Sequence, residues 1–90
     1  MPTAHRRAMA FDYGTRQIGV AVGQTLTGSA EPLTNLRARD GVPDWEQIAR
    51  LIREWEPNVL VVGLPLNMDG SASDMSERAA RFARRLNGRF

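Results

Sequence analysis

The chain has no cysteine, no lysine and no long apolar segment, and each absence narrows the possible functions. Without cysteine, disulfide frameworks and thiolate metal sites are excluded. No hydrophobic run is long enough to span a bilayer. The first residues, Met-Pro-Thr-Ala-His-Arg-Arg, lack the apolar core of a signal peptide. We therefore expect a cytoplasmic protein that has no membrane among its partners.

The composition is that of one small globular domain. Ninety residues can bury a modest core, and a hydrophobic fraction of 42% argues against disorder. All 12 basic residues are arginine, although the formal net charge is only +2. Arginine suits phosphate because its planar fork can bind two oxygens at once. A coding bias toward arginine explains the same composition, so the placement of the arginines is more informative than their number.

The first third of the sequence predicts a three-stranded antiparallel meander. Strands are expected at residues 7–11, 18–23 and 29–36, because the turns between them are too short for crossover connections. One face of the second strand carries small residues, which predicts that a helix or another backbone approaches it closely. These small residues are Gly19, Ala21 and Gly23.

The remaining sequence predicts a helix, a strand and a second helix. The first helix is capped by Asp44, with Gln47 placed for a capping box, and it ends before Pro57. The segment at 58–64 carries a continuous apolar run after its first residue, which is typical of a strand buried on both faces. A right-handed crossover would place this fourth strand parallel to the first. The second helix is expected at about 75–87.

Asp12 is the main candidate for chemistry. It ends an apolar run where valine or isoleucine would be usual, and Gly14 follows it in a polar turn. A carboxylate at the mouth of a strand hairpin is costly unless a cation meets it there. No helix follows directly, which argues against a helix cap. We therefore predict that Asp12 is catalytic and binds a metal ion.

Parallel pairing of the first and fourth strands would gather further residues at the rim beside Asp12, where open α/β sheets bind ligands. Acidic, amide and glycine groups together suit a divalent cation that holds phosphate oxygens. Asp69 with Gly70 is also a standard turn pair, which favours a structural role for that aspartate. Predicted phosphate contacts are Thr15, Arg16 and Asn67, and predicted loop-shaping residues are Gly14, Gly63, Pro65, Asp69 and Gly70.

Three arginines flank the apolar stripe of the second predicted helix, namely Arg78, Arg81 and Arg85. Cations at this spacing can follow a nucleic-acid backbone. A solvated helix face would show the same pattern. The sequence leaves both interpretations open.

Three segments together resemble one known family. They are Phe-Asp-Tyr-Gly-Thr-Arg-Gln-Ile-Gly-Val-Ala-Val-Gly at 11–23, Ala-Glu-Pro-Leu at 30–33 and Val-Val-Gly-Leu-Pro-Leu-Asn-Met-Asp-Gly at 61–70. They are similar to the YqgF family, described as Holliday-junction resolvases and as pre-16S rRNA nucleases. The resemblance implies an RNase H-like fold and phosphodiester hydrolysis that depends on Mg²⁺ or Mn²⁺. It also implies structured nucleic acid as the substrate, either branched DNA or the 5′ end of an rRNA precursor.

The resemblance further implies that part of the catalytic site is missing. Family members continue into a fifth strand with an Asp-Glu-Arg motif and a later helix with another aspartate, and these acids complete the metal site. Of the catalytic acids, this sequence holds only Asp12. We therefore expect residues 1–90 to form one RNase H-like domain, truncated at its C-terminus, with four strands and two helices. Alone it should be inactive, and the exposed edge of its last strand could self-associate.

The sequence leaves two other function classes open. The ATP-binding domains of actin, heat-shock chaperones and sugar kinases hold phosphates with a similar Asp-x-Gly-Thr hairpin, in longer chains with a second phosphate loop. A non-catalytic module that binds nucleic acid or the ribosome would also use the arginines. Parallel titrations of ATP and a branched nucleic acid would separate these classes.

Overall fold

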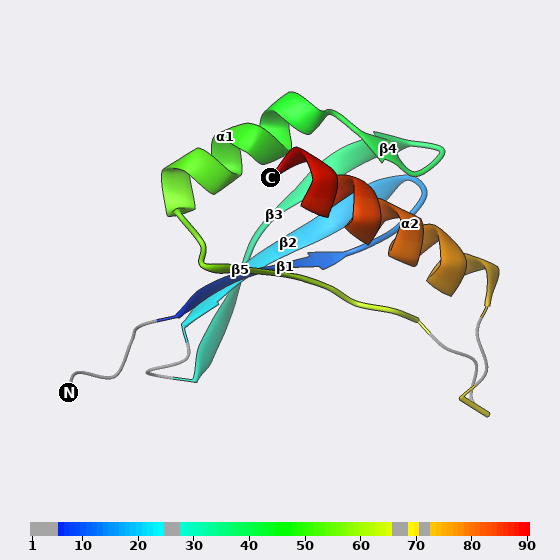
Figure 1. The fold of residues 1–90 in the computed structure, drawn as a ribbon, viewed down its shortest axis with the longest axis horizontal. Helices are drawn as coiled ribbons and strands as arrows, with labels where there is room; N and C mark the ends of the chain where they lie inside the picture. The colour runs from blue at the N-terminus through cyan, green and yellow to red at the C-terminus, as the bar shows by residue number, and fades with distance from the viewer. Residues whose placement is uncertain (1–5, 25–27, 66–68, 71–72) are drawn as a thin grey trace.

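The computed structural model describes residues 6–24, 28–65, 69–70 and 73–90. The elements follow the order β1 (Arg7–Asp12), β2 (Gln17–Gln24), β3 (Ser29–Arg39), β4 (Val42–Pro43), α1 (Trp45–Trp55), β5 (Val59–Val62) and α2 (Asp74–Arg89). They form one mixed sheet in the order β4-β3-β2-β1-β5, in which β5 is parallel to β1 and the other neighbours are antiparallel (Figure 1). This arrangement confirms the predicted α/β class, the meander, the parallel last strand and the two helices, and it is compatible with an RNase H-like fold.

The sheet has one strand more than predicted among the described residues. The additional strand, β4, pairs with the end of β3 through a tight turn in which Asp40 and Gly41 have φ of 47° and 82°. β3 itself continues to Arg39, three residues past its predicted end. At and beyond the predicted end, Leu36 and Ala38 are buried, while Arg37 and Arg39 are exposed. This alternation is the two-residue period of a half-buried strand, and the predicted end at residue 36 cut it short.

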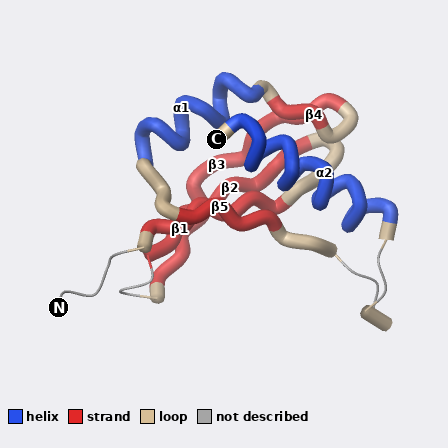
Figure 2. The backbone as a smooth tube through the Cα atoms, in the orientation of Figure 1, coloured by secondary structure: helices blue, strands red, loops and turns tan. Residues whose placement is uncertain are grey.

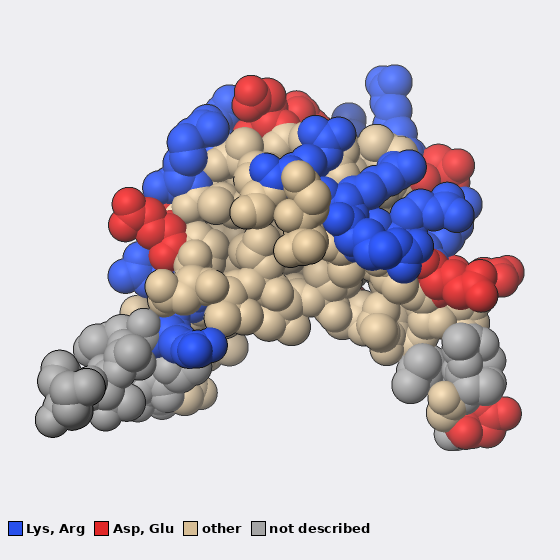
Figure 3. Space-filling model, viewed as in Figure 1, with Lys and Arg blue, Asp and Glu red and all other residues tan. Residues whose placement is uncertain are grey.

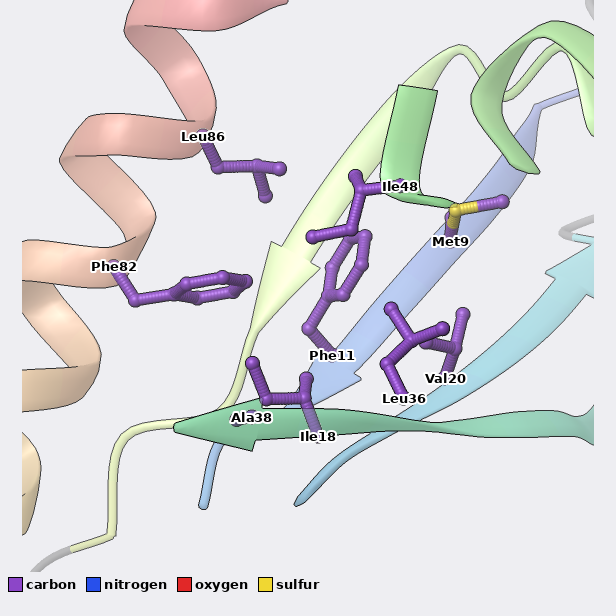
Figure 4. Close-up of a cluster of buried hydrophobic side chains, with 9 residues drawn as sticks. All are labelled: Met9, Phe11, Ile18, Val20, Leu36, Ala38, Ile48, Phe82 and Leu86. Atoms are coloured by element: carbon purple, nitrogen blue, oxygen red, sulfur yellow. The ribbon is translucent and has the colours of Figure 1, made fainter. Parts of the chain in front are cut away.

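Both helices cover the same face of the sheet (Figure 2). Side chains from β1, β2 and β3 point from that face toward α1 and α2, and together they form the core (Figure 4). Phe82 of α2 is central, because its ring lies 5.7 Å from Phe11, 5.3 Å from Tyr13 and 5.6 Å from Trp45. The buried cluster consists of Met9, Phe11, Ile18, Val20, Leu36, Ala38, Ile48, Phe82 and Leu86.

The opposite face of the sheet is bare in the described part of the chain. It forms an open hollow of about 540 Å³ whose lining includes Ala10, Gly19 and Ala21. The sequence predicted that a helix or another backbone approaches these small residues. No helix covers them among the residues that the structure places, but backbone does approach Gly23, where a Cβ would lie 2.9 Å from the carbonyl oxygen of Ser29. The prediction that the last strand is buried on both faces is wrong, since Val61 is 45% exposed.

The helix ends follow local hydrogen-bond rules, with one change from the prediction. Asp44 caps α1, but its side chain accepts from the backbone N–H of Glu46 at 3.0 Å rather than forming a box with Gln47. The capping box occurs at α2 instead. There Ser73 and Ser76 each accept a backbone N–H of the other, at 3.1 and 2.8 Å. Neither helix has the length and hydrophobicity of a membrane span in the described residues.

Candidate metal and nucleic-acid site

Asp12 lies at the end of β1, on the bare face of the sheet. Alternation along the strand buries Met9 and Phe11 under the helices and leaves Asp12 exposed on the other side. Its partner on β2 is Gly19. On the parallel neighbour, Gly63 donates its N–H to the carbonyl of Phe11 at 3.1 Å, which places this glycine next to Asp12. The carboxylate is therefore flanked by a glycine on each side.

The exposure of Asp12 changes the reason for regarding it as a metal ligand. The apolar run before Asp12 predicted a carboxylate at the end of a buried strand, where its desolvation would demand a cation. The structure places the side chain in solvent, so that cost does not arise. The geometry supports a different argument. Two neighbours without side chains leave the carboxylate open to a bulky ligand such as a phosphodiester.

Asn35 is a polar neighbour that the sequence did not single out. Gly19 pairs with Asp12 on one side and with Asn35 of β3 on the other. A Cβ atom built on Gly19 would lie 3.5 Å from the Cβ of Asp12 and 3.3 Å from the Oδ1 of Asn35. The glycine thus separates a carboxylate from an amide oxygen on the same face. This register depends on the irregularity at Val20 and Ala21, which the sequence pattern did not reveal.

The described residues fit part of a divalent-metal site. Magnesium prefers oxygen ligands and is commonly held by one or two carboxylates together with water and substrate phosphates. Asp12 and Asn35 supply oxygens of this kind on one face. No group of three histidine, cysteine or acidic side chains suited to a metal occurs in the part of the chain described. The donor set matches a first protein ligand for one ion, not a complete site for two.

The turn between β1 and β2 is tied to the β3–β4 hairpin through its backbone. The carbonyl of Thr15 accepts from the N–H of Gly41 at 2.9 Å, and that of Arg16 accepts from Ala38 at 2.8 Å. Gly14 is sterically required, since a Cβ there would come within 2.5 Å of the carbonyl oxygen of Gln17. These bonds fix the turn beside Asp12 without using the side chains of Thr15 or Arg16.

The loop after β5 is described only in part. Gly63 lies at the predicted rim beside β1, and the carbonyl of Pro65 accepts from the hydroxyl of Ser73 at 3.3 Å, which ties the loop to the start of α2. Gly70 has φ of 85°, in keeping with the predicted turn at Asp69. Asn67 lies outside the described residues, so its predicted phosphate contact stays a prediction.

The arginine stripe lies on the other side of the sheet from Asp12. Arg78, Arg81 and Arg85 line a second hollow on the helix-covered side, and arginines gather over α2 in the space-filling view (Figure 3). Tyr13, which directly follows Asp12, also turns to this side, where it packs on Phe82. The structure therefore places the two groups of predicted site residues, those around Asp12 and the arginine stripe, on opposite sides of the sheet.

Comparison with known proteins identifies the family. A family model described as RuvX, Holliday junction resolvase, matches residues 6–90. The chain belongs to the RuvX family. This match confirms the YqgF resemblance drawn from the sequence motifs.

Curated relatives of this RuvX-family chain are similar along nearly all of it. A protein of Pseudomonas paraeruginosa is 66% identical over 85 residues, 94% of this chain and 59% of the relative. One of Pseudomonas fluorescens is 66% identical over 87 residues, 97% and 60% of the two chains. One of Azotobacter vinelandii is 65% identical over 85 residues, 94% and 60%. Each is named "Putative pre-16S rRNA nuclease". The chain spans about three-fifths of the length of these relatives.

Proposed function

We propose that this RuvX-family chain carries the first metal ligand and part of the substrate surface of a cytoplasmic nuclease that depends on Mg²⁺ or Mn²⁺. The carrying observation is the exposed carboxylate of Asp12, which ends β1 between two glycines on the bare face of the sheet. The proposed reaction is cleavage at the 5′ end of a 16S rRNA precursor, supported by the names of the relatives. The family description supports a Holliday junction as the alternative substrate.

The residues beside Asp12 each have a separate part in this proposal. Asp12 holds the ion, and Asn35 lies close enough to contact its hydration shell or the substrate. An ion bound there would polarise a phosphodiester and lower the pKa of a bound water. Gly19 and Gly63 admit the sugar–phosphate backbone because they present no side chain. Thr15 and Arg16 offer a hydroxyl and a guanidinium at the turn over which the backbone passes.

The same proposal implies that the ninety-residue chain is catalytically incomplete. Two divalent cations a few ångströms apart repel one another and need several carboxylates to hold them. In the described residues no cluster of acidic side chains surrounds Asp12. We expect the chain alone to bind a metal ion weakly and to show no turnover.

A chimera tests the function. The chain would be extended by the part of the Azotobacter relative that lies outside the match, and both proteins assayed with Mg²⁺ or Mn²⁺ on rRNA-precursor and branched-DNA substrates. We expect cleavage by the chimera, none by the chain alone, and none by the chimera with Asp12→Asn. Normal cleavage by the Asp12→Asn chimera would contradict the assignment.

The same proteins separate the nuclease from the other function classes. Parallel titration with ATP tests the chaperone and sugar-kinase class, which would bind ATP with Mg²⁺ more tightly than nucleic acid. Binding of nucleic acid by the chimera, without cleavage under any metal condition, would favour a non-catalytic module. Either result would replace the nuclease proposal.

A further inference from the structure

A small hollow of about 220 Å³ lies between the β1–β2 turn, the β3–β4 hairpin and α2. It is on the helix-covered side, so it is distinct from the hollow that contains Asp12. Its walls are cationic and its inner part is aromatic. The arginines are Arg78, Arg81 and Arg85, and the aromatic residues are Tyr13, Trp45 and Phe82.

The aromatic rings of this hollow are already engaged. Phe82 is only 3% exposed. Trp45 stacks on it at 5.6 Å and also carries the guanidinium of Arg89 4.4 Å from its ring centroid. Tyr13 packs on Phe82 at 5.3 Å, and its hydroxyl lies tightly against Gly41. A nucleobase needs a free ring face on which to stack, so these rings favour a ligand that is not a base.

The cations of the hollow are only partly neutralised. Arg78 contacts one carboxylate oxygen of Asp40 at 3.3 and 3.4 Å, with both side chains well exposed. Such surface pairs are weak. Arg81 and Arg85 have no anionic partner among the residues that the structure describes. Of the three guanidinium groups, only that of Arg78 contacts a carboxylate in the described residues, and the excess positive charge faces a hollow of limited size.

We infer that this hollow is a phosphate site for a nucleic-acid backbone, with Asp40 occupying Arg78 until a phosphate replaces it. Guanidinium forks bind phosphate oxygens in pairs, and the engaged rings make the site indifferent to base identity. Asp12 and Tyr13 are consecutive and point to opposite sides of the sheet. A strand held in the hollow would thus pass over the β1–β2 turn toward Asp12. The inference depends on the proposed function for its ligand class, nucleic acid.

The inference is tested by binding measurements without divalent metal. The chain would be titrated with inorganic phosphate, with a single-stranded oligonucleotide and with an abasic oligonucleotide of equal length. We expect both oligonucleotides to bind with affinities that agree within about twofold, a difference of about 0.4 kcal/mol. Much weaker binding of the abasic strand would show that bases are read. Binding of inorganic phosphate without binding of either oligonucleotide would exclude nucleic acid as the ligand. Either outcome would overturn the inference.

Variants that remove a positive or a negative charge at the hollow test its location, because they should change oligonucleotide affinity in opposite directions. Arg81→Gln and Arg85→Gln should each weaken oligonucleotide binding by about three- to tenfold. Each should also reduce the slope of log affinity against log salt by about 0.7. Arg53→Gln on α1 removes the same charge elsewhere and is the matched control. Asp40→Asn should strengthen binding by about two- to fivefold, because it frees Arg78; asparagine also tolerates the left-handed backbone of this turn.

Equal effects of Arg53→Gln and the two α2 variants would show a diffuse charge effect and overturn the site. Weaker binding by Asp40→Asn would overturn the role of that carboxylate. Circular dichroism confirms that each variant is folded. Since no metal is present and Asp12 is unchanged, these results leave the metal proposal unaffected. Conversely, loss of the metal role of Asp12 would leave phosphate binding in the hollow intact.

Discussion

The two faces of the sheet use the same strands for opposite purposes. On the helix-covered face, Met9, Phe11 and Ile18 are at most 1% exposed and pack under α1 and α2. On the bare face, Asp12 and Gly19 lie in an open hollow with small neighbours. Because side chains alternate along a strand, β1 divides its residues between a core that stabilises the fold and an open surface on which we propose that the metal ion and substrate bind. Substitutions on the two faces should therefore separate stability from binding.

The largest expected loss of stability comes from a substitution on the helix-covered face. Phe82→Ala removes a ring that contacts three other aromatic side chains, and such truncations cost about 3–5 kcal/mol. In a domain of this size the loss should lower Tm by more than about 10 °C. Val61→Ala on the bare face, where the side chain is 45% exposed, is the control and should cost below about 1 kcal/mol. Similar losses in thermal unfolding would erase the distinction between the faces.

A smaller effect is expected at the rim of the covered side. Gly41 and Gly70 both have positive φ, 82° and 85°, so alanine at either position incurs a backbone cost of about 1–2 kcal/mol. A methyl group on Gly41 would also collide with the hydroxyl of Tyr13, whereas nothing lies within 4 Å of the corresponding position on Gly70. Gly41→Ala should therefore have the lower free energy of unfolding by urea denaturation. Equal losses in the free energy of unfolding for the two variants would show that the side chain of Tyr13 moves aside at little cost.

The next comparison concerns Gly19→Ala on the bare face. The added methyl would sit 3.3 Å from Asn35 Oδ1 and 3.5 Å from the Cβ of Asp12, which is tight but tolerable. We expect stability to change by less than about 1 kcal/mol. Mn²⁺ affinity, followed by titration calorimetry, should fall because the methyl fills the space beside the carboxylate. A large loss of stability with unchanged Mn²⁺ affinity would mean that this face is structural.

The smallest expected effect concerns the edge of the sheet. β5 is an edge strand in the described sheet, and apolar side chains such as Val61 and Leu64 are 45% and 55% exposed near it. Unpaired edges of this kind promote pairing with other chains. We expect weak, concentration-dependent self-association in sedimentation velocity, reduced by Val61→Lys. A strictly monomeric chain at high concentration would contradict this expectation.

Much of the fold could be predicted from local pattern, while the site depended on register. The small residues on one face of β2 and the boundary signals of α1 at Asp44 and Pro57 identified their elements correctly, because each signal is contained in a few consecutive residues. The β3–β4 hairpin was missed because its strand is two residues long. Asn35 was missed because its position beside Gly19 depends on a strand irregularity and on tertiary pairing.

The arginine stripe shows the same limit. The helical period correctly grouped Arg78, Arg81 and Arg85, but it carried no information about which side of the sheet α2 would cover. The side of the sheet that α2 covers is decided by the packing of side chains such as Phe82 and Leu86 in the core. The sequence therefore predicted both groups of candidate residues without predicting that the sheet separates them.

The most direct test of the account is paramagnetic line broadening by Mn²⁺ in NMR spectra of the chain and its Asp12→Asn variant. In the wild type, broadening should centre on the amides of Asp12, Gly19 and Gly63. In Asp12→Asn it should disappear at equal Mn²⁺ concentration, while Tm stays within about 2 °C because the side chain is exposed. Broadening that persists in the variant, or that centres on Asp69 and Asp74, would contradict the claim that the bare face holds the metal through Asp12.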